Sequence, residues 1–101
     1  MQSTAPRAEL HADAKRELDD AVAYFEADWE YQGILFLDSF NTAVERLLRY
    51  PLAGKARGRV RRWVMANWRY TLIYAVEPYG IFIIAIAHHS RRPNYWRERI
   101  R

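Results

Sequence analysis

The chain of 101 residues contains no cysteine, which excludes disulfide bonds, a thiolate nucleophile and a cysteine-ligated metal site. It also lacks any apolar stretch close to the roughly 20 residues that a membrane-spanning helix needs. Residues 1–10 have no apolar core of the kind that is typical of a secretory signal. We therefore expect a cytoplasmic protein with no membrane partner.

Acidic residues are scarce in the second half of the chain. Residues 1–50 carry five Lys or Arg and ten Asp or Glu, a net charge of −5, whereas residues 51–101 carry eleven and two, a net charge of +9. Fourteen of the sixteen basic residues are arginine, whose planar guanidinium suits phosphate, carboxylate and aromatic partners better than lysine does. The basic half predicts an anionic partner, either nucleic acid or an acidic protein segment.

Hydrophobic residues make up half of the chain and aromatic residues 15%, which is enough for one modest core at this length. We therefore expect a single domain over residues 1–101. Within it, residues 1–6 are expected to be a frayed lead-in, residues 7–10 a short edge strand, and residues 91–101 a basic tail. After Pro93 this tail is expected to form a short helix whose apolar contacts are Trp96 and Ile100.

Two amphipathic helices are predicted in the first half. The first starts at about residue 11 and ends near residues 28–33, and the second runs from about residue 34 to residue 49, where Pro51 and Gly54 stop it. A short loop between them makes an antiparallel hairpin. The predicted apolar faces consist of Ala14, Leu18, Ala21, Val22, Phe25 and Trp29 in the first helix, and of Leu37, Phe40, Val44, Leu47 and Leu48 in the second.

Three strands are predicted in the second half, at residues 59–65, 70–77 and 81–88, after a loop at residues 52–58. The last two flank the sequence Glu-Pro-Tyr-Gly at residues 77–80, which fits a type I turn and predicts a hairpin. The last strand is apolar over seven residues, which is typical of a central strand that is buried on both faces. The expected fold is α+β, with a two-helix antiparallel hairpin on one face of a small, mainly antiparallel sheet of three to four strands.

The last predicted strand ends in two adjacent histidines. In a strand, His88 and His89 point to opposite faces, so they cannot ligate one metal ion together, and His11 is the only other histidine. We therefore expect no metal and no cofactor. One of the two could act as a general acid or base near neutral pH, but the plainer interpretation is that one packs and the other is solvated.

Arginines alternate with aromatic residues along the basic half, a pattern that fits stacking on bases or contact with a protein partner. The plainer interpretation is that the tryptophans fill the core and the arginines keep a basic face soluble. The predicted partner-binding residues are Arg61, Arg62, Trp63, Arg69, His88, Arg91, Arg92 and Trp96.

The order of short strand, two helices, three strands and basic tail resembles the RelE/ParE superfamily of toxins from bacterial type II toxin–antitoxin modules, whose ParE-like branch includes plasmid stabilisation proteins. The ending of the chain, with His88, Arg92, Pro93 and Trp96, is similar to that of the ParE branch. The other residues that carry the resemblance are Ala14, Glu17, Leu18, Ala21, Tyr24, Phe36, Phe40, Leu47, Tyr50, Pro51, Gly54, Val60, Arg61 and the YTLIY segment at residues 70–74.

The resemblance implies one of two activities. RelE-like toxins are ribosome-dependent ribonucleases that cut mRNA without metal, using basic residues and usually a tyrosine, whereas ParE-like toxins lack that set and poison DNA gyrase. The two arginines and the tyrosine of the RelE set fall on Thr71, near Ser90 and on Trp96. A tryptophan N–H does not exchange a proton as a general acid or base, so this chain is poorly equipped for that cleavage.

We therefore expect a ParE-like toxin that inhibits DNA gyrase by binding, is not an enzyme, and is neutralised by a cognate acidic antitoxin, as a homodimer or as a toxin–antitoxin hetero-oligomer. One alternative is a RelE-like, metal-independent endoribonuclease that acts on ribosome-bound mRNA, with His88, His89, Arg91 and Arg92 as its site. The other alternative is a binding module of the same fold without toxicity.

Overall fold

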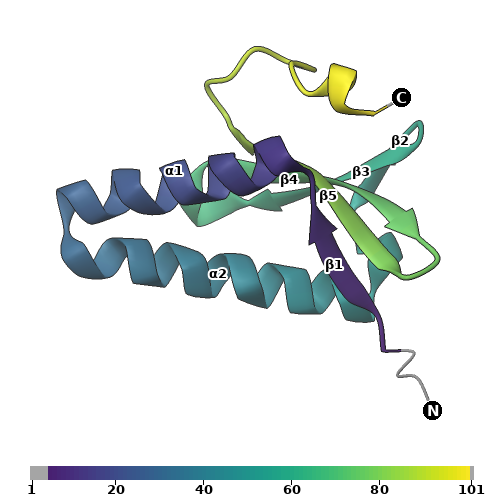
Figure 1. The fold of residues 1–101 in the computed structure, drawn as a ribbon, viewed down its shortest axis with the longest axis horizontal. Coiled ribbons are helices and arrows are strands. Elements are labelled where there is room, and N and C mark those ends of the chain that lie inside the picture. Colours follow the sequence, from purple (N-terminus) through teal and green to yellow (C-terminus); the bar gives the residue numbers. More distant parts are fainter. Residues whose placement is uncertain (1–4, 101) are drawn as a thin grey trace.

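The computed structural model describes residues 5–100 and packs two helices against one face of a five-stranded sheet (Figure 1). The α+β class and the helical hairpin are confirmed, whereas the number of strands is larger than the three to four that were predicted. The predicted frayed lead-in falls mostly on residues 1–4, which lie outside the described residues. In chain order the elements are β1 (Arg7–Leu10), α1 (Ala12–Asp28), α2 (Glu30–Arg49), β2 (Lys55–Arg57), β3 (Val60–Met65), β4 (Tyr70–Glu77) and β5 (Gly80–His88), with short 3-10 turns at Pro51–Ala53, Ala66–Trp68 and Arg97–Arg99.

The helical hairpin is tighter than the sequence pattern indicated. A single residue, Trp29, separates α1 from α2, so α2 begins four residues earlier than predicted. Close approach of the helices depends on Gly33, because a Cβ atom there would lie 2.9 Å from the carbonyl oxygen of Val22 and would collide with the side chain of Glu26. The two helices therefore cross with backbone almost touching backbone.

The buried stripe of α2 differs from the predicted one at its start. The residues that face the core recur at helical spacing and are Gly33, Phe36, Phe40, Ala43 and Leu47. The predictions that Leu37 and Trp29 belong to the apolar faces were wrong, because these side chains are 37% and 54% exposed. Leu37 follows the buried Phe36 by one residue, which turns it about 100° away around the helix.

The sheet has the strand order β1-β5-β4-β3-β2, with β1 parallel to β5 and the other neighbours antiparallel. The β4–β5 hairpin is confirmed, with Glu77 opposite Gly80. β5 is an interior strand with buried residues on both faces, as predicted, but β4 takes the middle position. Strand β2 was predicted as loop, because its three residues are all exposed and show no apolar alternation. It forms by pairing with β3, with Lys55 opposite Arg62.

The two faces of the sheet carry separate clusters of buried residues. The face under α1 and α2, called the helix face below, contributes Met65, Leu72, Tyr74, Ile81, Ile83 and Ile86 to the larger cluster. The other face, called the tail face, is covered by the C-terminal tail, which turns back above the strands in Figure 1. There Trp96 packs with Val60, Ile73, Ile84 and Ala85, and Ile100 lies against them, which confirms the two predicted contacts of the tail. Among residues 5–100, no helix is long and apolar enough to cross a membrane.

Candidate partner-binding surface

The two histidines at the end of β5 point to opposite faces of the sheet, as predicted. The ring of His88 lies 5.0 Å from the ring of Tyr70 on the helix face, and its Nδ1 lies 2.7 Å from Ser90 Oγ. His89 Nε2 lies 3.0 Å from Thr71 Oγ1 on the tail face. Within residues 5–100, no group of three His, Asp or Glu side chains is placed to hold a metal ion.

The tail is fastened to α1 mainly by the carboxylate of Glu17, and Arg99 Nε also lies 3.7 Å from Asp13 Oδ2. Glu17 Oε1 accepts a hydrogen bond from Arg99 Nη1 at 2.9 Å, and Oε2 accepts from Arg99 Nη2 at 2.9 Å and from the Tyr95 hydroxyl at 2.6 Å. Both members of the ion pair are only 13% exposed. Bidentate, charge-assisted contacts of this kind are the strong ones among side-chain hydrogen bonds, so the pair fixes the position of the tail.

The same ion pair covers an open edge of β5. β1 pairs with β5 only at residues 80–83, which leaves the rest of that edge without a neighbouring strand. Beyond this point the Ile86 N–H donates to Glu17 Oε1 at 3.0 Å, and Arg99 Nη1 donates to the Ile84 carbonyl at 3.1 Å. Side chains that lie far apart in the sequence thus satisfy backbone groups that a longer β1 would otherwise have paired.

The electrostatics of this network fix the protonation of its members. Burial alone would raise the pKa of Glu17, but hydrogen bonds from Arg99, Tyr95 and the Ile86 N–H, together with the charge of Arg99, hold that pKa below its usual value. Burial and the Glu17 carboxylate raise the pKa of Tyr95 well above its usual range. The hydrogen bond to Glu17 raises the pKa of Arg99 in spite of burial. The network is therefore an ionised carboxylate between a neutral tyrosine and a cationic arginine.

Beside this network the tail face has a cavity of about 210 Å³, called the tail-face cavity below. Its lining combines the end of β5, neighbouring positions of β3 and β4, and the start of the tail. Three arginines and two histidines line it, and no Asp or Glu does. The lining residues are Arg62, Thr71, Ile73, Ala87, His88, His89, Arg91, Arg92, Pro93, Asn94, Tyr95 and Trp96.

The structure brings five of the eight predicted partner-binding residues to this cavity, namely Arg62, His88, Arg91, Arg92 and Trp96. Arg92 is exposed, whereas Arg91 stacks on the ring of Tyr95 at 3.9 Å and lies 3.8 Å from Glu17 Oε2. Trp96 is only 3% exposed and belongs to the core of the tail face. Trp96 therefore supports the wall of the cavity from the core. This agrees with the plainer interpretation given above, in which the tryptophans fill the core.

Three predicted residues lie elsewhere. Arg61 donates from Nη1 to the carbonyls of Leu52 and Gly54, at 3.1 and 2.8 Å, and so holds the segment that precedes β2. Trp63 faces the helices, with its ring 5.5 Å from the guanidinium of Arg46. Arg69 ends the Ala66–Trp68 turn with φ at 62° and its side chain is exposed. Their part in partner binding stays a prediction.

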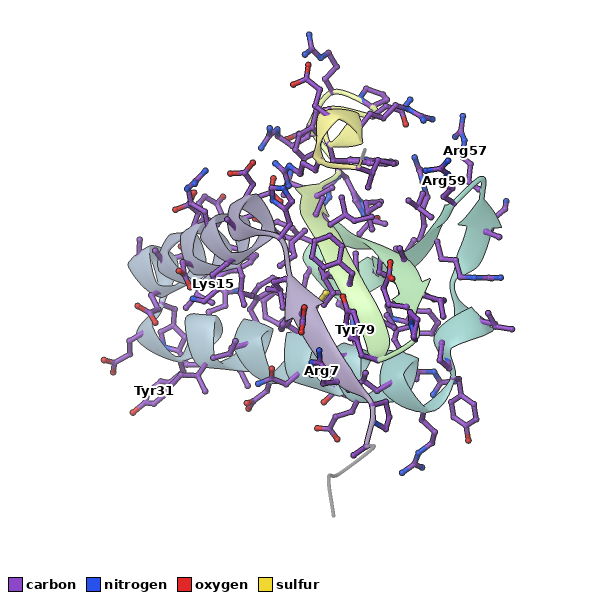
Figure 2. All side chains as sticks on the ribbon, turned by 45° about the vertical axis from the view of Figure 1, so that its right-hand side comes forward. Arg7, Lys15, Tyr31, Arg57, Arg59 and Tyr79 are labelled. Carbon is purple, nitrogen blue, oxygen red and sulfur yellow. The ribbon has the colours of Figure 1, made fainter. Side chains whose placement is uncertain are left out.

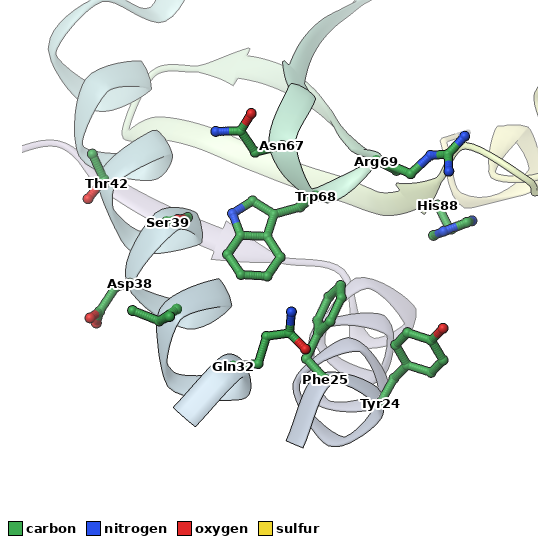
Figure 3. Close-up of a pocket in the computed structure, with 11 residues that line it drawn as sticks. Tyr24, Phe25, Gln32, Asp38, Ser39, Thr42, Asn67, Trp68, Arg69 and His88 are labelled. Carbon is green, nitrogen blue, oxygen red and sulfur yellow. The ribbon is translucent and has the colours of Figure 1, made fainter. Parts of the chain in front are cut away.

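Arg69 and His88 share a second hollow, a groove of about 900 Å³ between the helices and the Ala66–Trp68 turn. Figure 3 shows Trp68 in the middle of this groove, above Phe25 and Gln32, with Arg69 and His88 at one end. The rings of Phe25 and Trp68 lie 5.0 Å apart in an edge-to-face arrangement. This helix-face groove has an aromatic floor and a polar rim, and no sequence pattern predicted it.

Comparison with protein families finds a match over residues 8–93 to the ParE toxin of the type II toxin–antitoxin system parDE. The chain belongs to the ParE toxin family. A solved structure from P. aeruginosa, described as a chromosomal ParDE toxin–antitoxin system, has the same fold, with a TM-score of 0.70 at 16% sequence identity over 85% of this chain and 98% of that chain. A comparison with curated protein sequences found no match.

The residues that fasten the tail of this ParE-family chain were not among the predicted site residues. Glu17 lies beside the apolar stripe of α1, between the buried Ala14 and Leu18, and a carboxylate at such a position indicates a buried partner. Tyr95 and Arg99 carry no comparable sign, because the tail is rich in arginine and only the fold shows which one meets Glu17.

Proposed function

We propose that this ParE-family toxin inhibits DNA gyrase by binding, that its tail face is the surface that meets gyrase, and that a cognate acidic antitoxin neutralises it. The observation that carries the proposal is the tail-face cavity, whose lining contains three arginines and no Asp or Glu; of the three, Arg91 also lies 3.8 Å from Glu17 Oε2. A surface of one charge sign attracts a partner of the other sign and orients it on approach.

The chemistry of the tail supports binding over catalysis. Trp96 stands where the RelE-like resemblance places a catalytic tyrosine, and its side chain is buried. The one tail tyrosine nearby, Tyr95, donates its hydroxyl to Glu17, and its raised pKa keeps that proton in place at neutral pH. Tyr95 is therefore a structural residue and not a general acid or base of this cavity.

An acidic antitoxin would find basic residues at one end of the helix-face groove and in the tail-face cavity. His88 lines both hollows, so a single extended segment that crosses the end of β5 could contact Arg69 in one and Arg92 in the other. The aromatic floor of the groove fits an apolar face of such a segment, and the arginines fit its carboxylates.

The decisive experiment measures supercoiling by purified gyrase at increasing concentrations of the chain. We expect supercoiling to be lost, and to return when the cognate antitoxin is added in equal amount. In parallel, reporter mRNA on translating ribosomes should stay uncut. Intact supercoiling together with cuts in the ribosomal A site would replace the proposal by the RelE-like alternative, and inactivity in both assays would favour the binding module without toxicity.

A further inference from the structure

We propose that the tail-face cavity is a binding site for a phosphate group, of the kind that a phosphate monoester presents. The lining has three guanidinium groups and two imidazoles but no carboxylate. Guanidinium groups form paired, charge-assisted hydrogen bonds with phosphate oxygens. The volume of about 210 Å³ accommodates one such group with the first atoms of whatever carries it. The site does not depend on whether the chain inhibits gyrase.

Arg62 is the strongest sign of a missing partner. Its Nε is buried and has no hydrogen-bond partner among residues 5–100. The neighbouring Arg61 points to the other face of the sheet and donates to two backbone carbonyls. An arginine of β3 that has a structural role is therefore provided with hydrogen-bond acceptors, whereas Arg62 Nε is not. A buried N–H of a cation without an acceptor costs free energy, and an anion in the cavity would supply that acceptor.

Asn94 supplies a second polar atom without a partner in the same cavity. Its Oδ1 is buried and accepts no hydrogen bond among the described residues. The residue has φ at 62°, in the left-handed region that asparagine tolerates better than most residues. A rotation of the amide by 180° exchanges acceptor for donor, so Asn94 can meet either P–OH or P–O⁻. The unpaired Nε–H of Arg62 can donate to a phosphate oxygen, and the unpaired amide of Asn94 can bind a second oxygen or the hydroxyl of the same phosphate.

The aromatic residues around the cavity favour a phosphate group over a nucleobase. Trp96 is buried, and the ring of Tyr95 lies 3.9 Å from the guanidinium of Arg91 and 5.1 Å from that of Arg99. Neither ring offers an open face for the stacking that base-binding surfaces use. A phosphate monoester carries a charge of −1.5 to −2 and three acceptor oxygens, more than a backbone diester or a carboxylate, and so it fits Arg62, Arg92 and Asn94 better.

The first test is an NMR titration of the uniformly ¹⁵N-labelled chain with inorganic phosphate, in which the Nε–H signals of the arginines are followed. We expect a saturable shift of the Arg62 Nε–H and of the Asn94 side-chain amide. A matched pair of oligonucleotides, one with a 5′-phosphate and one with a 5′-hydroxyl, then separates the terminal monoester from the backbone diesters. We expect the phosphorylated oligonucleotide to bind about tenfold more tightly, as one added charged hydrogen bond would give.

Variants test whether Arg62 carries the binding. Arg62→Ala should weaken phosphate binding at least about tenfold, and Arg62→Lys should also weaken it, because lysine keeps the charge but has no Nε–H. The control is Arg57→Ala, which removes the same charge from the tip of the β2–β3 hairpin, where Figure 2 shows Arg57 projecting into solvent. It should leave binding unchanged.

Three outcomes would overturn the proposal. Equal weakening of phosphate binding by Arg62→Ala and Arg57→Ala would show general attraction by net charge. Equal binding of the two oligonucleotides would remove the preference for a monoester. Tighter binding of a tetraglutamate peptide than of phosphate would assign the cavity to a protein partner. Should Arg62→Ala fail to fold, the wild-type titration still decides, because an unshifted Arg62 Nε–H at saturating phosphate refutes the site. A chain that binds phosphate but leaves gyrase active would refute only the proposed function.

Discussion

The two faces of the sheet are covered by different kinds of structure. The helix face is closed by a two-helix hairpin and by aromatic rings, with Phe36 5.1 Å from Phe25 and 5.2 Å from Tyr70. The tail face is closed by a short segment that contributes one buried tryptophan and is fastened through Glu17 and Arg99. The first is a large apolar core with the helix-face groove at its edge, whereas the second combines a small apolar cluster with the three arginines of the tail-face cavity. The helix face therefore holds the larger buried cluster, and we propose that the tail face is the surface that recognises gyrase.

Truncation of one buried aromatic residue on each face should have the largest effect and tests whether the two faces unfold separately. Phe36→Ala and Trp96→Ala should each destabilise the fold by roughly 3 to 5 kcal/mol, since both side chains are buried. We expect Phe36→Ala to unfold the whole chain in one transition. Trp96→Ala should instead first release the tail, so that protease removes residues after 90 while near-ultraviolet circular dichroism of the helix-face rings persists. Simultaneous loss of both signals in Trp96→Ala would show that the faces are not separable.

Removal of the tail's ionic attachment should have the next largest effect. Glu17→Gln keeps the shape but weakens contacts to Arg99, Tyr95 and the Ile86 N–H. This should lower the free energy of unfolding by about 1.5 to 3 kcal/mol, the range for hydrogen bonds to charged groups. Urea denaturation measures this loss. The control Asp19→Asn breaks an exposed pair with Lys15 on the same helix and should cost under about 1 kcal/mol. Equal costs would mean that the Glu17 network adds little.

The same carboxylate gives stability a defined dependence on pH. Because the pKa of Glu17 is lowered on folding, its contribution is complete above the ordinary value of about 4.3 and disappears as the pH falls through the lower folded pKa. The free energy of unfolding of the wild type should therefore fall more than that of Glu17→Gln between about pH 5 and the acid transition. Both proteins are measured at the same ionic strength, because salt screens charge interactions. Parallel stability curves for the two proteins would contradict the lowered pKa.

Much of the helix face could be predicted from the sequence because local patterns specify it. The periodicity of Ala14, Leu18 and Ala21 and the turn at Pro78 predicted both helices and the β4–β5 hairpin. The exposed β2 has no such pattern, and its strand form depends on pairing with β3. The contact of Glu17 with Arg99 spans 82 positions and could not be inferred from spacing. The tail face was harder to predict than the helix face, because polar contacts between residues far apart in the sequence hold it together.

Charge reversal at exposed basic residues should have a smaller effect, on the rate of antitoxin association. Arg69→Glu with Arg92→Glu alters two exposed side chains, one at the helix-face groove and one at the tail-face cavity. We expect association to slow by about tenfold at low salt, with less change in dissociation, because steering acts on the approach of the partners. Arg57→Glu with Arg59→Glu makes the same charge change at the β2–β3 hairpin tip and is the control. Association that is equal in both double variants at every salt concentration would exclude the predicted docking surface.

The most direct test of the tail face as the functional surface compares gyrase inhibition by Arg92→Ala and Arg57→Ala. Both side chains are exposed, so each substitution should change the free energy of unfolding by no more than about 0.5 kcal/mol, which thermal melts will verify. We expect Arg92→Ala to lose inhibition of supercoiling and toxicity in growing cells while Arg57→Ala retains both. A folded Arg92→Ala protein that inhibits gyrase as strongly as wild type would contradict the assignment of recognition to the tail face.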